Sequence, residues 1–175
     1  MKIKLVLFYF LANMIAGMEI QVSIDKQELN VVDDEKIVKT YVISSSSYGE
    51  GSAEGSFKTP LGEHFIKKKI GDGVELGGRF EGRIFYGEIY PIYDKDEVYV
   101  DDDVVQTRIL WLSGLEEGKN KGKGVDSFER YIYIHGTPEE WLLGTKASKG
   151  CIRMANKDVI ELFDIVEENT KVIIK

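Results

Sequence analysis

Cysteine and histidine are scarce in this chain, whose 175 residues include one Cys and two His. A single cysteine cannot form an intramolecular disulfide, so a fold stapled by disulfides is excluded. Metal binding is also disfavoured, because Cys151 and His135 lack further ligands at a suitable spacing. The lone cysteine is therefore either an inert buried thiol or a reactive one.

A basic surface is lacking as well. The chain carries 23 Lys and Arg against 30 Asp and Glu, which gives a net charge of -7. Nucleic-acid-binding domains are usually basic, with Lys and Arg clustered on one face. The short basic run Lys67–Lys69 is more typical of a solvated edge. We therefore expect no nucleic-acid partner.

The apolar run at the N-terminus, Leu5–Gly17, is too short for a comfortable membrane span of about 20 residues. It follows Lys2 and Lys4, and a basic start before an apolar stretch is typical of a secretory signal peptide. We expect residues 1–17 to be a signal peptide or an uncleaved N-terminal anchor, with membrane contact only in the second case. A buried first strand or helix is the alternative. The domain at 18–175 would then lie in the periplasm or elsewhere outside the cytoplasm.

Glycine, tyrosine and short β-branched runs are abundant and favour strands joined by turns. Alternating residues predict a hairpin at Ile20–Asp25 and Glu28–Val32, followed by a strand at Ile37–Ser44. Further strands are expected at 63–70, 86–93, 107–114, 130–136 and 171–175. The sequence thus predicts a single-domain, mostly-β sandwich or partly closed barrel.

One late amphipathic helix completes this fold. Asn156 is placed to cap it, and Asn169 to end it. Apolar residues follow at helical spacing, at Val159, Leu162, Phe163 and Val166.

Cys151 and His135 together have the minimal composition for nucleophilic acyl transfer. An imidazole can take the thiol proton, and the thiolate can then attack a carbonyl. The amides of Gly150 and Cys151 could stabilise the resulting oxyanion. Lys149, Arg153 and the helix N-terminus are each expected to lower the pKa of the thiol. A core thiol beside a structural histidine remains the alternative at this point.

Four segments carry a resemblance to a known family: "TPLGEHFI" at 59–66, "HGT" at 135–137, "SKGCIRM" at 148–154 and "NKDVIELF" at 156–163. They resemble the catalytic core of the L,D-transpeptidases, also called the YkuD-like or ErfK/YbiS-like family. The resemblance covers roughly Ile20 to the C-terminus.

The resemblance implies a role for each matching residue. Cys151 corresponds to the nucleophile and His135 to the general base, with the carbonyl of Gly136 expected to orient the imidazole. Arg153 is expected to order the site or to hold a substrate carboxylate. Lys149 departs from many members, which have a second histidine there. The small positions of the motif are Ser148 and Gly150.

The implied substrate is the tetrapeptide stem of peptidoglycan, and the implied location is the cell wall. Cys151 would attack the carbonyl at the L-centre of the third residue, and D-alanine would leave a thioester behind. The acceptor stays open: a stem amine, a lysine of a lipoprotein, or water, which would give an L,D-carboxypeptidase. No cofactor is needed by this chemistry. A wall-binding module without activity and a plain thiol hydrolase are the other hypotheses.

Other residues have weaker claims to a role. His64 is expected to pack on a strand or to face solvent. Trp111 and Trp141 could line a groove for a peptide or a sugar chain, although core or rim packing suits Trp111 better. The acidic run Asp101–Asp103 lacks the spacing of a calcium loop and is expected to be a solvated turn.

Overall fold

The computed structural model describes residues 17–100 and 103–175, so the predicted signal segment lies outside the described residues except for Gly17. Within these ranges the chain forms ten strands, one α-helix and one short 3-10 helix. Among the described residues, no helix combines the length and the apolar character of a membrane span. The elements are β1 (Glu19–Ser23), β2 (Glu28–Asp33), β3 (Lys36–Ser44), β4 (Gly62–Ile70), β5 (Gly78–Glu81), β6 (Ile84–Ile89), β7 (Val105–Gly114), β8 (Tyr133–Gly136), η1 (Glu140–Leu142), β9 (Ile152–Met154), α1 (Asn156–Ile165) and β10 (Lys171–Ile174).

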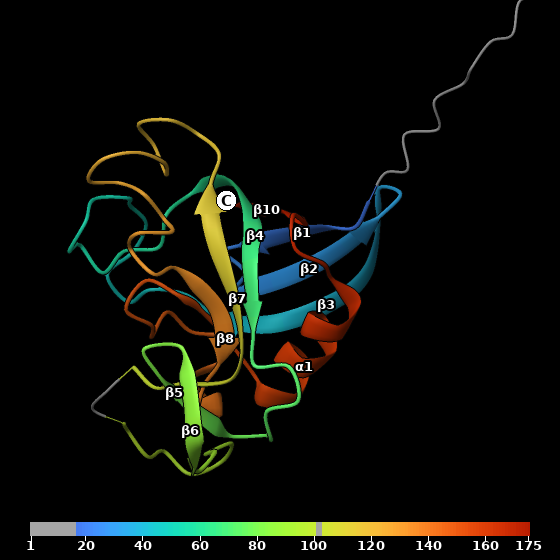
Figure 1. Cartoon of the computed structure of the whole chain (residues 1–175), viewed down its shortest axis with the longest axis vertical. Helices are drawn as coiled ribbons and strands as arrows, with labels where there is room; N and C mark the ends of the chain where they lie inside the picture. Colours follow the sequence, from blue (N-terminus) through green and yellow to red (C-terminus); the bar gives the residue numbers. More distant parts are fainter. Residues whose placement is uncertain (1–16, 101–102) are drawn as a thin grey trace, which may run out of the picture.

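The strands of the described chain form one sheet that closes on itself. Their order is β4-β10-β1-β2-β3-β9-β8-β7-β5-β6, and an additional pairing between β4 and β7 joins the two sides into a barrel. The C-terminal part of β7 pairs with β4, and its first residues pair with β5. The β5–β6 hairpin therefore extends beyond the barrel, as its place at the lower end of Figure 1 shows. This confirms the predicted mostly-β fold in its barrel form.

Period-two alternation explains which side chains fill the barrel. In β1 the buried residues are Ile20 and Val22, and in β2 they are Leu29 and Val31. Successive side chains on a strand point to opposite faces, so one face enters the core and the other meets solvent or a second layer. The predicted hairpin and third strand are confirmed. Strands β5 and β9 were not predicted, because each has only three or four residues, too few for a pattern to stand out in the sequence.

Helix α1 packs against β7 and β8 with Val159, Leu162 and Phe163 buried, as its spacing predicted. The predicted N-cap is wrong, because the N-cap residue is Ala155 and makes no side-chain cap. The N–H of Asn156 instead donates to Glu140 Oε1 at 2.7 Å, so η1 supplies the missing acceptor. The helix also ends at Ile165, before the predicted Asn169.

Asn156 is fully buried and joins three segments of the chain. Its amide nitrogen donates to the carbonyl of Thr137 and to Glu140 Oε1, both at 2.8 Å. Its amide oxygen accepts from the hydroxyl of Thr107 in β7. Asn156 therefore anchors the start of α1 to the ends of β7 and β8.

We expect Asn156→Ala to lower the free energy of unfolding by about 1–3 kcal/mol, because it leaves buried polar groups without partners. Chemical denaturation of the purified domain measures this change. Asn30→Ala is the matched control, because Asn30 is only partly buried in β2 and its side chain bonds, among the described residues, to the exposed Thr40 alone. It should change stability by no more than about 0.5 kcal/mol. Equal losses in the two variants would contradict the anchoring role of Asn156.

Candidate active site

The parallel pairing of β8 with β9 sets the geometry of the site. Ile134 lies opposite Ile152 and His135 opposite Arg153. Ile134 and Ile152 enter the barrel core, so His135 and Arg153 face the other way. Cys151 directly precedes β9 and packs against the cluster that contains Tyr133, which lies two residues before His135 and so on the same face of β8. The fold thus brings together the two residues that the sequence predicted to act as a pair.

His135 is fully buried, and its Nδ1 lies 2.8 Å from the carbonyl oxygen of Gly136. A carbonyl can only accept, so Nδ1 carries the proton and Nε2 presents its lone pair. Nε2 has no hydrogen-bond partner among the described residues. Burial lowers the pKa of His135 below its ordinary value, which keeps the imidazole neutral and able to take a proton.

Gly136 is packed tightly against Asn156 and the backbone of Gln106. A Cβ at this position would lie 2.3 Å from Asn156 Oδ1 and 2.7 Å from the carbonyl oxygen of Gln106. No side chain fits there without moving the backbone. The carbonyl that orients His135 is therefore fixed by the packing of Gly136 between β7 and the start of α1.

The thiol of Cys151 is held by two backbone groups. Its S–H donates to the carbonyl of Tyr131, and the N–H of Tyr133 donates to Sγ, both at 3.4 Å. Cys151 is partly exposed as a residue, and its sulfur makes no hydrogen bond to His135 in the structure. Catalytic hydrogen bonds are often unformed without substrate.

The predicted activation of the thiol is wrong for this state of the protein. Burial, followed by the negative charge of Asp103, raises the pKa of Cys151 to about 12. The Tyr133 N–H, Arg153 and Arg130 act in the opposite direction but do not outweigh burial. The cysteine is therefore a neutral thiol at pH 7. Arg153 acts in the expected sense and lowers this pKa, and the side chain of Lys149 is exposed.

Ser148 and Gly150 shape the turn that precedes the thiol. The hydroxyl of Ser148 donates to the carbonyl of Cys151 at 2.6 Å and accepts from the N–H of Gly150 at 3.2 Å. Gly150 has φ +123°, a conformation that side-chain-bearing residues rarely adopt. The Gly150 N–H, expected as an oxyanion donor, is thus already bonded to Ser148. The N–H of Cys151 makes no hydrogen bond to the rest of the described chain.

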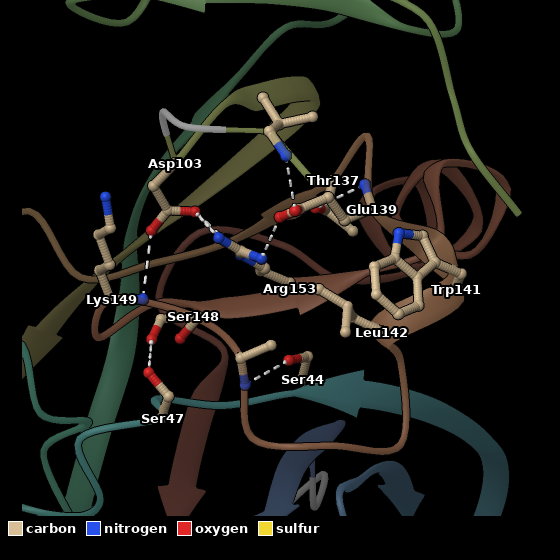
Figure 2. Close-up of polar contacts among 12 residues, drawn as sticks. Ser44, Ser47, Asp103, Thr137, Glu139, Trp141, Leu142, Ser148, Lys149 and Arg153 are labelled. Carbon is tan, nitrogen blue, oxygen red and sulfur yellow. Dashed lines mark hydrogen bonds and ion pairs between the residues drawn. The ribbon is translucent and has the colours of Figure 1, made fainter. Parts of the chain in front are cut away.

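Arg153 is buried between two carboxylates, as Figure 2 shows. Its Nε lies 2.9 Å from Asp103 Oδ1, and its Nη1 lies 2.8 Å from Glu139 Oε2. Of the two roles implied for Arg153, this geometry supports ordering the site, because its guanidinium is already paired with two carboxylates. The predicted solvated turn is wrong for Asp103, since this carboxylate is four-fifths buried against Arg153; Asp101 and Asp102 lie outside the described residues.

The same two carboxylates also accept from backbone N–H groups, one in the turn before Cys151 and one in the loop before β7. Asp103 Oδ2 accepts from the backbone N–H of Lys149 at 3.3 Å, and Glu139 Oε1 accepts from the N–H of Val100 at 2.9 Å. In Figure 2 these contacts surround the guanidinium of Arg153. Sequence reasoning missed both acids, and neither has a local signal beyond its charge.

His64 and Trp141, which the sequence left as weaker candidates, make structural contacts. His64 is fully buried in β4 and bonds to the hydroxyl of Ser127 at 2.9 Å, so the strand-packing interpretation is right. Trp141 donates to the carbonyl of Val98 at 3.1 Å and meets Tyr99 edge-on. Within the described part of the chain, no three His, Cys, Asp or Glu side chains gather as metal ligands would.

Comparisons with known proteins agree on one family. The model of the YkuD family, described as the L,D-transpeptidase catalytic domain, matches residues 17–174. The YkuD protein of Bacillus subtilis is 58% identical over 46 residues, which is 26% of this chain and 28% of that protein. The alignment thus spans less than a third of that relative.

Solved structures share the fold. An L,D-transpeptidase from Mycobacterium smegmatis has a TM-score of 0.57 at 17% identity, with 91% of this chain and 59% of that chain covered. L,D-transpeptidase 3 from Mycobacterium tuberculosis, with a faropenem-derived adduct, has a TM-score of 0.55 at 16% identity, with 91% and 60% covered. At such identities the likeness establishes the fold alone.

The charge of Asp103 gives a test of the site electrostatics. Asp103→Asn removes a negative charge that raises the pKa of Cys151, so the thiol should titrate at lower pH. The pH dependence of alkylation by iodoacetamide, followed by intact mass, measures this shift. Glu50→Gln, which removes an exposed carboxylate paired with Lys146, should leave the profile unchanged. An unchanged or raised profile in Asp103→Asn would show that this carboxylate does not act on the sulfur.

Proposed function

The chain belongs to the L,D-transpeptidase family, and we propose that it is a cysteine acyltransferase acting on peptidoglycan stem tetrapeptides. The observation that carries the proposal is the state of His135. Its Nδ1 proton is bound by the Gly136 carbonyl, and its unpartnered Nε2 lies on the same face as Cys151. A buried neutral imidazole with an unused lone pair beside a thiol is the arrangement that a general base requires.

The proposed reaction begins with transfer of the Cys151 proton to Nε2 of His135. The sulfur forms a bond to the carbonyl carbon at the L-centre of the third stem residue, and the carbonyl oxygen becomes an oxyanion. The Cys151 N–H, which has no other acceptor in the described chain, is the donor placed to stabilise that charge. Collapse breaks the bond to D-alanine, whose nitrogen takes the proton from Nε2, and a thioester remains.

The second half of the reaction reverses these roles. An acceptor amine attacks the thioester, His135 takes its proton, and the bond between carbon and sulfur breaks. The departing thiolate takes the proton back, so the enzyme returns to its neutral thiol and imidazole. Proton movements balance within this pair, and the chemistry requires no cofactor.

Three acceptors fit this scheme. A stem amine gives a cross-link between the third residues of two stems, a lipoprotein lysine gives an anchored protein, and water gives a tripeptide. Transpeptidation is our proposal, since it is the activity for which the family is named. A non-catalytic wall-binding module is disfavoured, because Cys151 and His135 are both present on one face.

We also propose that the protein works outside the cytoplasm, associated with the cell wall. The motivating feature is the apolar run that follows Lys2 and Lys4. N-terminal sequencing of the wall-associated protein should find a chain that begins after about residue 17. Recovery of intact chain from the cytosol alone would contradict this proposal.

Removing either member of the pair should abolish most activity. We expect Cys151→Ala and His135→Ala each to reduce D-alanine release from muropeptide tetrapeptides by about a thousandfold or more, with the double variant no worse than Cys151→Ala. Mass analysis of the products identifies the acceptor: a dimer, a tripeptide or a protein-linked stem. Circular dichroism must first show an intact fold.

A carbapenem supplies the control for the nucleophile. A related enzyme from Mycobacterium tuberculosis is described with an adduct derived from faropenem, a penem, and acylation of Cys151 by the chemically related carbapenems is proposed here. The wild-type protein should gain one carbapenem mass, and Cys151→Ala should gain none. Adduct formation or full D-alanine release by Cys151→Ala would remove Cys151 from the reaction.

A further inference from the structure

Arg83 lies at the tip of the β5–β6 hairpin, where Gly82 and Arg83 both have positive φ. Its guanidinium carbon lies 4.9 Å from the ring centre of Trp111 and 4.8 Å from that of Tyr131. Its Nη1 donates to the hydroxyl of Tyr133 at 3.2 Å. Contacts of this kind hold a guanidinium over aromatic faces. The side chain is then already ordered, so it loses less conformational entropy when it binds a ligand.

The aromatic residues beneath Arg83 also hold the thiol. The carbonyl of Tyr131 and the N–H of Tyr133 are the two backbone groups bonded to Cys151 Sγ. Cys151 packs against the apolar cluster that contains Trp111 and Tyr133. The guanidinium of Arg83 and the sulfur of Cys151 therefore both contact the short segment 131–133.

Arg83 differs from the other four arginines in its partners. Arg79 and Arg153 form ion pairs with carboxylates, and Arg108 and Arg130 donate to backbone carbonyls. Among the described residues, Arg83 forms no ion pair, and a phenol oxygen is its single acceptor. Most of its five N–H donors are thus available to a ligand.

We propose that Arg83 binds a carboxylate of the acyl-donor stem peptide. This rests on the proposed function and assigns it a substrate-binding residue. Two carboxylates can lie within a short chain of bonds from the attacked carbonyl. One belongs to the departing D-alanine, and the other is on the side chain of the third stem residue where that residue is a diamino acid with a second carboxyl group. Arg153 is unsuited to either, because Asp103 and Glu139 already surround it. A planar guanidinium fixed on aromatic rings matches carboxylate geometry.

The first test compares Arg83→Gln and Arg83→Lys with the wild type in D-alanine release. We expect Arg83→Gln to raise KM about 10- to 100-fold, which corresponds to the loss of one charge-assisted hydrogen bond. The KM of Arg83→Lys should lie between those of the wild type and Arg83→Gln. Arg79→Gln is the matched control, because it removes a cation on the same hairpin that is already paired with Glu81 and Glu88. Alkylation of Cys151 by iodoacetamide should be unchanged in all of them.

Amidated substrates identify the carboxylate. A stem that ends in D-alaninamide and a stem amidated on its diamino acid side chain are each assayed with wild type and Arg83→Gln. Amidation of the carboxylate that Arg83 binds should raise the KM of the wild type. It should also abolish the difference in KM between the wild type and Arg83→Gln. If the difference survives both amidations, Arg83 does not bind a stem carboxylate.

Binding to a variant that cannot react separates this inference from the proposed function. Calorimetry of the tetrapeptide with Cys151→Ala should show affinity that falls about 10- to 100-fold when Arg83→Gln is added. Arg83-dependent binding without D-alanine release by the wild type would leave the inference standing and overturn the reaction. Equal affinities, or no binding at all, would overturn the inference whatever the wild type does.

Discussion

Strands β8 and β9 pair in parallel, with His135 opposite Arg153, and this register decides which side chains meet. Side chains alternate between faces, so a slip of one residue would send His135 into the barrel core and Ile134 toward the thiol. The contact between Gly136 and Asn156 opposes such a slip, because only a glycine fits against that amide. The register, the orientation of the imidazole and the start of α1 therefore depend on the same contact.

Burying Arg153 imposes its own cost on the site. A guanidinium removed from water must be paired with negative groups, and Asp103 and Glu139 supply them from segments far apart in sequence. The ion pairs tie both segments to the strand that follows the nucleophile. The consequence for chemistry is adverse, since the charge of Asp103 raises the pKa of the neighbouring thiol. The ion pairs thus fix the geometry of the site, and the charge of Asp103 disfavours the thiolate form of Cys151 in the unliganded protein.

The sequence predicted what depends on local pattern. Alternation found the β1–β2 hairpin, and helical spacing found the buried face of α1. The family resemblance of the segments around His135 and Cys151 pointed to one site. Sequence reasoning failed where the partner is distant. Asn is a common N-cap residue, yet the side-chain amide of Asn156 bonds to Thr107, Thr137 and Glu140 and does not cap the helix. Asp103 has the sequence context of a solvated turn, yet it pairs with Arg153 across 50 positions. No local pattern encodes either contact.

The neutral resting pair has a further electrostatic consequence. In the proposed reaction, thiolate forms only as the proton passes to His135, so any negative charge brought near the sulfur opposes that step. The proposed acyl donor, a stem peptide that ends in D-alanine, brings a carboxylate close to the attacked carbonyl. If that carboxylate approached unpaired, it would add to the effect of Asp103 on the thiol. If Arg83 holds it as proposed, its charge is compensated by a cation that has no other carboxylate in the described chain. The aromatic platform beneath Arg83 would then serve both to place the donor and to keep its charge from suppressing the nucleophile.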